Sequence, residues 1–529
     1  MPSRQLILVV LLLFVGGMTT VHAQTATEKS APGFDVWEIR VSGNSMLDRR
    51  LVERAVYPYL GPDRGIADVE AARKALETLY RDQGFPTVIV NIPEQDVSEG
   101  IVKLEVVQGR VDRMRISGST YFSLGRIRKS VPALAEGEVP HLPRVQEQLQ
   151  ALNQESGDRR ITPVFRPGRR PGTVEVELRV KDELPLHGSV ELNGRNSADT
   201  SRTRASANLR YDNLWQRMHS LSLQYQTSPQ EPDEVSVLAA TYVLPVRDGR
   251  DRLALYAINS ESDTEVGGTG DLSVIGNGTI LGIRWVRPLA ASGDYSHSLT
   301  LGADYKDFDE AIELVGADSL QTPIDYTRFS ADYRASLFGD QHMNSFSAGV
   351  NFGVRGLGNS EAEFEDKRFQ ARPNFAYLST RLSHERQLEG GIRLRGLLEG
   401  QLAGQPLISN EQFAAGGAES VRGYYESQQL GDDGVSATLE LYTPSLAGHL
   451  HERIDNLRLL AFADAAYLRN HDTLPGSPTS FELYGAGIGL RLSAFRSLSL
   501  NLDLAWPLTD SDEIERGDSR THFSLNYGF

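Results

Sequence analysis

From about Leu184 to Phe529, apolar and polar residues alternate in short segments, which are separated by clusters of Gly, Asp, Asn, Ser and Pro. This period of two is typical of β-strands that have one apolar and one polar face. About sixteen such segments can be marked, an even number within the range of bacterial outer-membrane barrels. An all-β sandwich fits any single segment equally well. The end of the chain favours the barrel.

The last segment, THFSLNYGF, has aromatic and apolar side chains on one strand face and small polar residues on the other. A lipid-facing apolar surface and a polar lumen are what a membrane barrel strand requires. We therefore predict a sixteen-stranded antiparallel outer-membrane β-barrel over residues 184–529, about the size of known bacterial barrels. The segment also resembles the C-terminal signal by which such barrels are recognised for assembly. The residues of that signal are Phe523, Leu525, Tyr527 and Phe529.

Before the barrel, two stretches have helical spacing, VEAARKALETLYRDQGF at 69–85 and LPRVQEQLQALNQ at 142–154. Each follows a strand that ends in a Ser-Gly turn, IRVSGNS or MRISGST, and each is followed by alternating strands. This repetition predicts two small α+β modules in tandem, with one larger α+β domain as the alternative. The expected modules are residues 34–109 and 110–183.

The first residues have the pattern of a secretory signal peptide. A basic Arg4 precedes an apolar run from Leu6 to Val15, and small residues follow before Gln24. A single membrane anchor is the alternative, but the run is shorter than the roughly 18 residues that span a bilayer. We expect residues 1–23 to be removed on export, which leaves a short polar segment at 24–33.

Composition and charge exclude several classes of function. The formal net charge is −16, whereas nucleic-acid binding needs concentrated Lys and Arg, so no nucleic-acid partner is expected. The chain has no cysteine, which excludes thiolate metal sites and catalytic thiols.

No motif points to an enzyme. YGAGIGLRL, at 484–492, lacks the spacing of a nucleotide loop and is predicted to be a barrel strand with small residues in the lumen. His449 and His451 lack a third ligand cluster, and the acidic clusters EAEFEDK, at 361–367, and SDEIERGDS, at 511–519, are predicted to be loops or turns. We expect no enzymatic activity, no cofactor and no metal.

One loop carries a specific motif. EQFAAGGAESVRGYYES, at 411–427, lies between the eleventh and twelfth strand candidates by our approximate count, so it is an extracellular connection if the barrel begins in the periplasm. It resembles the sixth extracellular loop of TpsB and BamA-type transporters, whose hallmark is a Val-Arg-Gly-Tyr tetrad. The matching residues are Val421, Arg422, Gly423 and Tyr424.

The resemblance implies that this loop folds back into the lumen, where its arginine meets the aspartate of a Phe-x-Asp-x-Gly strand motif. In LRLLAFADAAYL, Phe462 and Asp464 match, whereas Ala466 stands where glycine is usual. These three residues share one strand face, which should point into the lumen because a carboxylate avoids lipid. We therefore expect a charge-assisted pair between Arg422 and Asp464.

The two modules resemble periplasmic POTRA domains. FDVWEIRVSGNS and IPEQDVSEGIVKLEVVQGRV place the first close to the form seen in TpsB two-partner secretion transporters, which are ShlB/FhaC/HecB-like haemolysin secretion/activation proteins of the BamA/TpsB superfamily. The resemblance implies a transporter that recognises an unfolded TpsA-type, β-helical partner through its POTRA domains and moves it through the barrel to the cell surface. Other implied partners are outer-membrane lipids, the barrel assembly machinery and periplasmic chaperones.

Two alternatives remain at this point: a BamA- or TamA-like assembly factor and a passive porin. The chain also departs from the TpsB pattern, because only the segment 24–33 separates the expected cleavage site from the first module, and it has no helical periodicity. We therefore expect no N-terminal plug helix, and a lumen that is obstructed mainly by the inward-folded loop.

Overall fold

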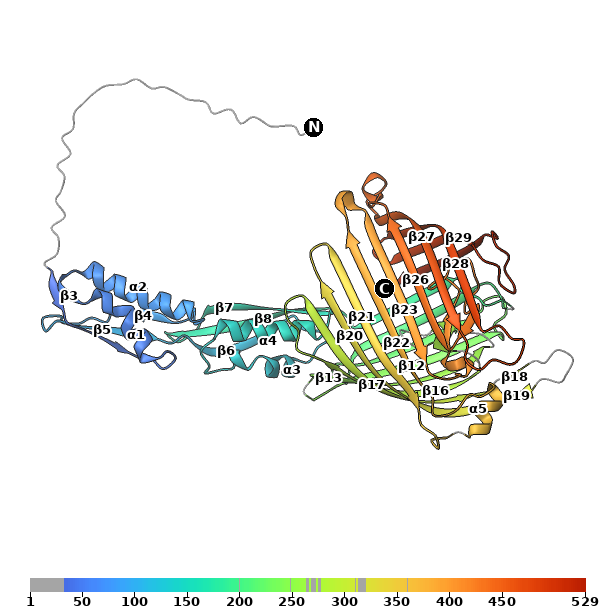
Figure 1. Ribbon diagram of the computed structural model, residues 1–529. Helices are drawn as coiled ribbons and strands as arrows, with labels where there is room; N and C mark the ends of the chain where they lie inside the picture. The colour runs from blue at the N-terminus through green and yellow to red at the C-terminus, as the bar shows by residue number, and fades with distance from the viewer. Residues whose placement is uncertain are drawn as a thin grey trace, which may run out of the picture. The chain divides into compact units, whose positions relative to one another are not determined.

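The computed structural model describes residues 33–529, with gaps at 199, 248, 263–265, 268–272, 275–276, 310, 313–319 and 359. The expected signal peptide, 1–23, and the segment 24–32 lie outside the described residues. The chain divides between Asp182 and Glu183 into two compact units (Figure 1).

The first unit begins with a small α+β module whose mixed sheet has the strand order β2-β5-β4, with β2 and β5 parallel. Helix α2 turns Val69, Ala72, Leu76 and Tyr80 into the core, which is the spacing that predicted the helix. The elements are β1 (Phe34–Val36), β2 (Glu38–Ser42), α1 (Arg49–Val56), η1 (Tyr57–Tyr59), β3 (Gly61–Arg64), α2 (Ile66–Asp82), β4 (Ile89–Asn91) and β5 (Ile101–Val107).

A second module repeats this arrangement. Its strand order is β6-β8-β7, with β6 and β8 parallel and β7 and β8 antiparallel. Helix α4 buries Val145, Leu149 and Leu152. The elements are β6 (Arg110–Ser117), α3 (Leu124–Ser130), η2 (Pro132–Leu134), α4 (Leu142–Gln154), β7 (Arg159–Pro167) and β8 (Thr173–Asp182). Across the residues that the structure describes, no helix is both long enough and apolar enough to cross a bilayer.

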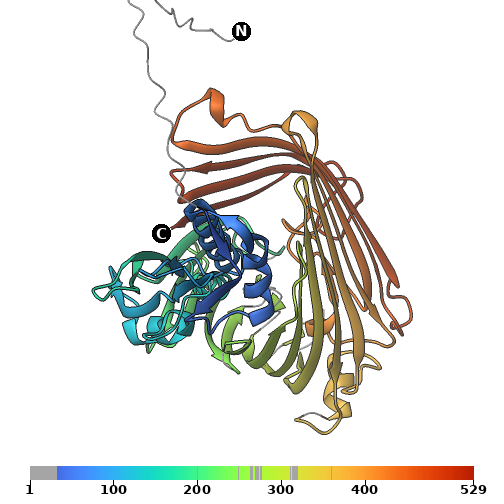
Figure 2. The ribbon, with the colours of Figure 1, turned by 90° about the vertical axis from the view of Figure 1, so that its left-hand side faces the viewer.

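The second unit is a closed antiparallel barrel of sixteen strands, in which β30 pairs with β9. Figure 2 shows the strands of this unit curving round into a barrel. The predicted barrel is thereby confirmed. Its strands are β9 (Leu186–Asn193), β10 (Arg204–Leu214), β11 (His219–Thr227), β12 (Val235–Val246), β13 (Asp251–Ser262), β16 (Gly278–Pro288), β17 (Tyr295–Phe308), β20 (Ile324–Phe338), β21 (His342–Gly353), β22 (Ala376–Gln387), β23 (Arg393–Ala403), β26 (Asp433–Tyr442), β27 (Ile454–Arg469), β28 (Ser480–Ala494), β29 (Leu498–Pro507) and β30 (Arg520–Gly528).

The barrel strands alternate in burial as a lumen and a lipid face require. On β27, Phe462, Asp464 and Ala466 are buried, whereas Leu459 and Tyr467 are exposed. This is the alternation that the sequence predicts.

The two ends of the barrel differ in the length of their connections. The turn between β28 and β29 takes residues 495–497, whereas the connection between β23 and β26 at the other end takes residues 404–432. Short turns lie in the periplasm and long loops outside the cell. The chain also enters β9, the first barrel strand, at the short-turn end, so both observations assign residues 404–432 to the extracellular side.

One prediction for the barrel region is wrong. The acidic segment EAEFEDK, predicted to be a loop, forms helix α5 (Glu361–Lys367) beside the long-loop end of the barrel (Figure 1). Ser360 and Glu363 form a capping box, and Phe364 is buried. With one large apolar residue in the segment, no helical periodicity could show, but the Ser-x-x-Glu capping signature was present in the sequence.

Candidate functional site

The connection between β23 and β26, called here the lumenal loop (residues 404–432), turns back into the barrel. Its two arms pair as a short hairpin, β24 (Phe413–Ala415) with β25 (Gln429–Gly431). Gly416, Gly417 and Gly423 have φ values of +114°, +102° and +104°, which side chains other than glycine rarely adopt. These turns bring Val421, Arg422 and Tyr424 to buried positions.

The Arg422 guanidinium binds Asp464 of β27 through two parallel hydrogen bonds. Nε donates to Asp464 Oδ2 at 2.8 Å, and Nη2 donates to Oδ1 at 2.9 Å. The backbone N–H of Arg422 also donates to Asp464 Oδ2 at 3.1 Å. Both side chains are buried. The geometry is that of a bidentate, charge-assisted pair, which is stronger than a hydrogen bond between neutral groups.

Two further carboxylates approach the same guanidinium, and sequence reasoning did not find them. Arg422 Nη1 donates to Glu440 Oε1 of β26 at 2.8 Å and lies 3.6 Å from Asp503 Oδ2 of β29. Arg395 and Arg491 balance this charge, because Arg395 pairs with Glu440 and Arg491 with Asp503. A signal existed, since Glu440 and Asp503 are acidic residues within alternating strands and such residues prefer the lumen. Their common partner depends on strand curvature, which the sequence does not show.

The Phe462 ring packs against the face of the Arg422 guanidinium. Arg422 Cζ lies 3.5 Å from the centroid of the Phe462 ring, which is a cation–π arrangement. The Phe-x-Asp pattern therefore supplies both a ring face and a carboxylate to one guanidinium.

The neighbouring motif residues attach the loop to the barrel wall. The Gly423 N–H donates to His522 Nε2 at 3.0 Å, so that nitrogen acts as an acceptor. The Tyr424 hydroxyl lies 3.0 Å from the Tyr484 carbonyl oxygen and 2.8 Å from the Thr509 carbonyl oxygen.

Small residues on the wall make room for the loop. A Cβ at Gly485 would overlap the Arg422 carbonyl, and one at Gly487 would overlap the Phe462 ring. Both glycines belong to YGAGIGLRL, which forms part of β28 as predicted. Ala466, which departs from the usual glycine, is buried in one apolar cluster with Val421 and Tyr424, so its methyl group is accommodated beside the loop.

A second attachment lies closer to the base of the lumenal loop. The Glu411 carboxylate accepts hydrogen bonds from the hydroxyls of Tyr326 at 2.6 Å and Tyr377 at 2.7 Å, and it pairs with Lys306. Arg328 Nη1 lies 3.5 Å from Glu411 Oε2. Glu411 is buried, and its partners belong to β17, β20 and β22. No sequence motif marked this residue.

The C-terminal residues close the barrel. Phe529 exchanges two backbone hydrogen bonds with Gly188, of 2.9 and 3.0 Å. The side chains of Leu525, Tyr527 and Phe529 are exposed on the outer face, and the Phe523 carbonyl accepts the Gly194 N–H at 3.0 Å.

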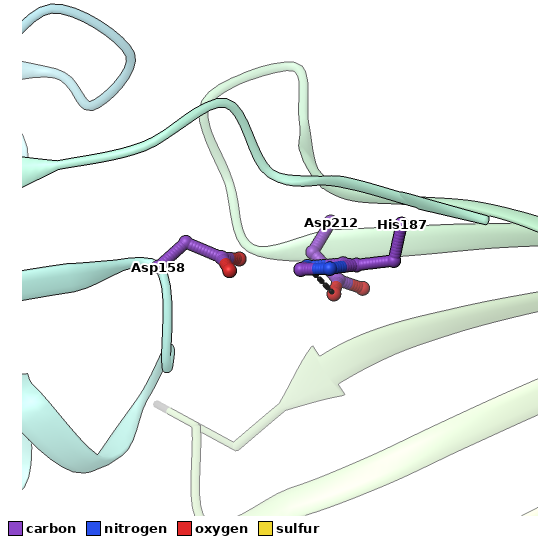
Figure 3. Close-up of side chains that lie close together, drawn as sticks. All are labelled: Asp158, His187 and Asp212. Atoms are coloured by element: carbon purple, nitrogen blue, oxygen red, sulfur yellow. Dashed lines mark ion pairs between the residues drawn. The ribbon is translucent and has the colours of Figure 1, made fainter. Parts of the chain in front are cut away.

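His187 of β9 and Asp212 of β10 form an ion pair of 3.7 Å (Figure 3). Asp158, which Figure 3 also labels, belongs to the first unit. A pair of side chains from one unit falls short of the three or four protein ligands that metal sites commonly use, so we assign no metal to this pair.

Comparisons with known proteins agree with this architecture. The family described as haemolysin secretion/activation protein ShlB/FhaC/HecB matches residues 172–492, and the ShlB-type POTRA domain matches residues 34–109. The outer membrane transporter CdiB of Dickeya dadantii is 22% identical over 485 residues, which are 90% of this chain and 83% of that protein. The heme/hemopexin transporter protein HuxB of Haemophilus influenzae is 21% identical over 459 residues, which are 86% of this chain and 80% of that protein.

Among solved structures, CdiB from Escherichia coli has the same fold, with a TM-score of 0.60 and 22% identity over 96% of this chain and 93% of that one. The family match covers more than half of the present chain. The chain therefore belongs to the ShlB/FhaC/HecB family of haemolysin secretion/activation proteins, and it is an outer-membrane transporter of two-partner secretion with its POTRA domains in the periplasm.

Proposed function

We propose that this transporter captures one unfolded TpsA-type, β-helical protein at its two POTRA modules, 34–109 and 110–183, and passes it as an extended chain through the barrel lumen. The Val421–Tyr424 motif, Phe462 and Asp464 hold the lumenal loop in place during this process. The observation that carries the proposal is the buried contact of Arg422 with Asp464 and Glu440 inside the barrel.

Strand addition suits the capture step. In each module, the central strand of the mixed sheet is flanked by edge strands: β4 and β2 in the first, β7 and β6 in the second. An edge strand has unpaired backbone groups that can bind an extended peptide as a further strand. A client that is still unfolded offers such segments.

The wall of the lumen suits the passage step. A cavity of about 870 Å³ lies along β10 to β23 and is lined by hydroxyl-bearing residues together with arginines. The lining residues that carry a hydroxyl include Ser222, Thr241, Thr300, Ser330, Ser347 and Ser379. Such groups can exchange hydrogen bonds with a moving backbone. The protein catalyses no reaction in this proposal, and the drive is folding of the client outside the cell, which prevents its return.

The remaining proposed partners are those that the chain meets during its insertion into the outer membrane. The outward-facing apolar side chains contact outer-membrane lipids, and the assembly signal Phe523, Leu525, Tyr527 and Phe529 is read by the barrel assembly machinery after periplasmic chaperones deliver the chain. The exposure of Leu525, Tyr527 and Phe529 on the outer face supports this proposal.

Charge reversal tests the role of the motif. We expect Arg422→Glu or Asp464→Arg to abolish surface export of the cognate client, while Arg217→Ala, in an exposed turn, leaves export unchanged. Export that persists in both charge-reversal variants would refute the assigned role. Depletion of the transporter should remove one secreted protein, and a general loss of outer-membrane proteins would instead indicate an assembly factor.

A further inference from the structure

Along the strands from β12 to β23, the inner wall of the barrel is apolar at its extracellular end. Val235, at the start of β12, Ile280, near the start of β16, and Phe308, at the end of β17, point inward and are buried. Ile324 and Tyr326, at the start of β20, join the same cluster. Because alternate barrel strands run in opposite directions, all of these positions lie at the long-loop end.

The connection between β21 and β22 packs against this apolar cluster. Its residues 360–375, called here the lid segment, contribute Phe364, Ala371 and Phe375, which are 1%, 1% and 2% exposed. The rings of Phe364 and Phe375 approach the Tyr326 ring edge to face, with centroids 5.7 and 6.0 Å away. The lid segment therefore packs against the inner wall rather than lying on the surface.

The inner wall changes from apolar to polar on the periplasmic side of the lid segment. On β20, the inward positions read Ile324 and Tyr326 and then Arg328, Ser330 and Asp332, and the last three line the polar cavity. Along β12 to β23, an apolar layer thus lies between the polar cavity and the extracellular end of the barrel. Apolar groups that pack closely exclude water and ions.

The lid segment is also fastened to the base of the lumenal loop. Arg368 donates two parallel hydrogen bonds to Asp432, one of 2.7 Å, and one of 2.6 Å to the Leu407 carbonyl. The Leu407 N–H donates back to Asp432 Oδ1 at 2.9 Å, and Asp432 is fully buried. Leu407 and Ile408 of the loop also join the apolar cluster. The lid segment is therefore bound to the loop base as well as to the inner wall.

We propose that the lid segment seals the resting pore at its extracellular mouth and lifts away from Tyr326 and from the base of the lumenal loop when a chain leaves the barrel. The sealing contacts are Phe364 and Phe375 on Tyr326, and the pairing of Arg368 with Asp432 holds the lid segment against the loop base. The opening step rests on the proposed passage through the lumen, but closure is a property of the protein alone. Ion conductance without any client therefore tests the lid independently of export.

The first test is ion conductance of the purified full-length protein in planar lipid bilayers with potassium chloride. Truncation of a buried Phe costs several kcal/mol, so we expect Phe364→Ala to raise the ratio of open to closed time at least about tenfold. Phe369→Ala is the matched control, because Phe369 lies in the same segment but is 40% exposed. Equal conductance of Phe364→Ala, Phe369→Ala and the unchanged protein would overturn the proposal.

A second test leaves the apolar packing intact. The chain has no cysteine, so Arg368→Cys with Asp432→Cys can be joined by a bifunctional thiol reagent that reduction removes. We expect the joined protein to stay closed and the reduced protein to open more often than the unchanged one. Asn344→Cys with His384→Cys, register partners on β21 and β22, is the control pair. Open events that are equally frequent before and after reduction would overturn the lifting step, even if Phe364→Ala fails to fold.

Discussion

Glu411 and Arg422 lie in the same loop but are bound to different parts of the barrel wall. Glu411 contacts Lys306, Tyr326 and Tyr377 on β17, β20 and β22, whereas Arg422 contacts Glu440 and Asp464 on β26 and β27. Each side chain is buried. The lumenal loop is therefore held to two parts of the barrel wall by two charges of opposite sign, each of which would be left buried and unpaired if its partners were removed.

The two carboxylates around Arg422 are expected to differ in importance. Asp464 accepts three hydrogen bonds from Arg422, and Glu440 accepts one. Loss of a buried partner costs about 3–5 kcal/mol, so Asp464→Asn should reduce client export at least about tenfold. Glu440→Gln should reduce it only about two- to fivefold, because a single charge-assisted hydrogen bond is lost. Surface export of the client measures both, and a larger effect of Glu440→Gln would contradict this order.

The glycines of β28 should affect the position of the lumenal loop only because they lack a side chain. Valine at Gly487 would overlap the Phe462 ring, so we expect Gly487→Val to displace the lumenal loop and to raise ion conductance in planar bilayers several-fold, as an overpacked site costs about 1–3 kcal/mol. The matched control is Gly396→Val on β23, where an added Cβ meets nothing within 4 Å. Equal conductance of the two variants would contradict the fit between loop and wall.

The Glu411 attachment should behave as a coupled pair. Glu411→Gln leaves the buried Lys306 ammonium without its carboxylate and should destabilise the barrel by about 3–5 kcal/mol. Lys306→Met should cost less, because Glu411 keeps Arg328 at 3.5 Å. The double variant should cost less than the sum, with a coupling of about 1–3 kcal/mol. A folded barrel migrates faster than the unfolded chain in a denaturing gel, so the temperature at which this difference disappears ranks the variants by stability. Additive effects of the two substitutions would argue against direct coupling.

The C-terminal residue should govern barrel assembly rather than transport. Phe529 joins the closing strands through its backbone and is 63% exposed on the outer face. We expect its deletion to lower the amount of folded protein in the outer membrane several-fold, because two closing hydrogen bonds worth about 1 kcal/mol each are lost together with the signal residue. Leu474→Ala, at an exposed loop position, is the control. Normal amounts of folded barrel without Phe529 would contradict the assembly role.

Periodic features were predictable from the sequence. The strand alternation, the helices that include Val69 and Val145, and the lumen face of Asp464 all follow from spacing, because each depends on neighbours only a few residues away. Helix α5 was missed because its burial depends on one residue, Phe364, which packs against Tyr326 of β20, a residue far from it in the sequence. The capping box at Ser360 was the available signal.

The sequence by itself determined the tandem α+β modules, the barrel and the arginine motif, since alternation, helical spacing and a short motif are written in consecutive residues. Only the tertiary structure decided that Glu440 and Asp503 join Asp464 around Arg422, that Glu411 binds β17, β20 and β22, and that residues 360–375 pack against the inner wall. These contacts join residues far apart in the chain. They depend on how sixteen strands curve into a closed ring, a geometry that no local pattern records.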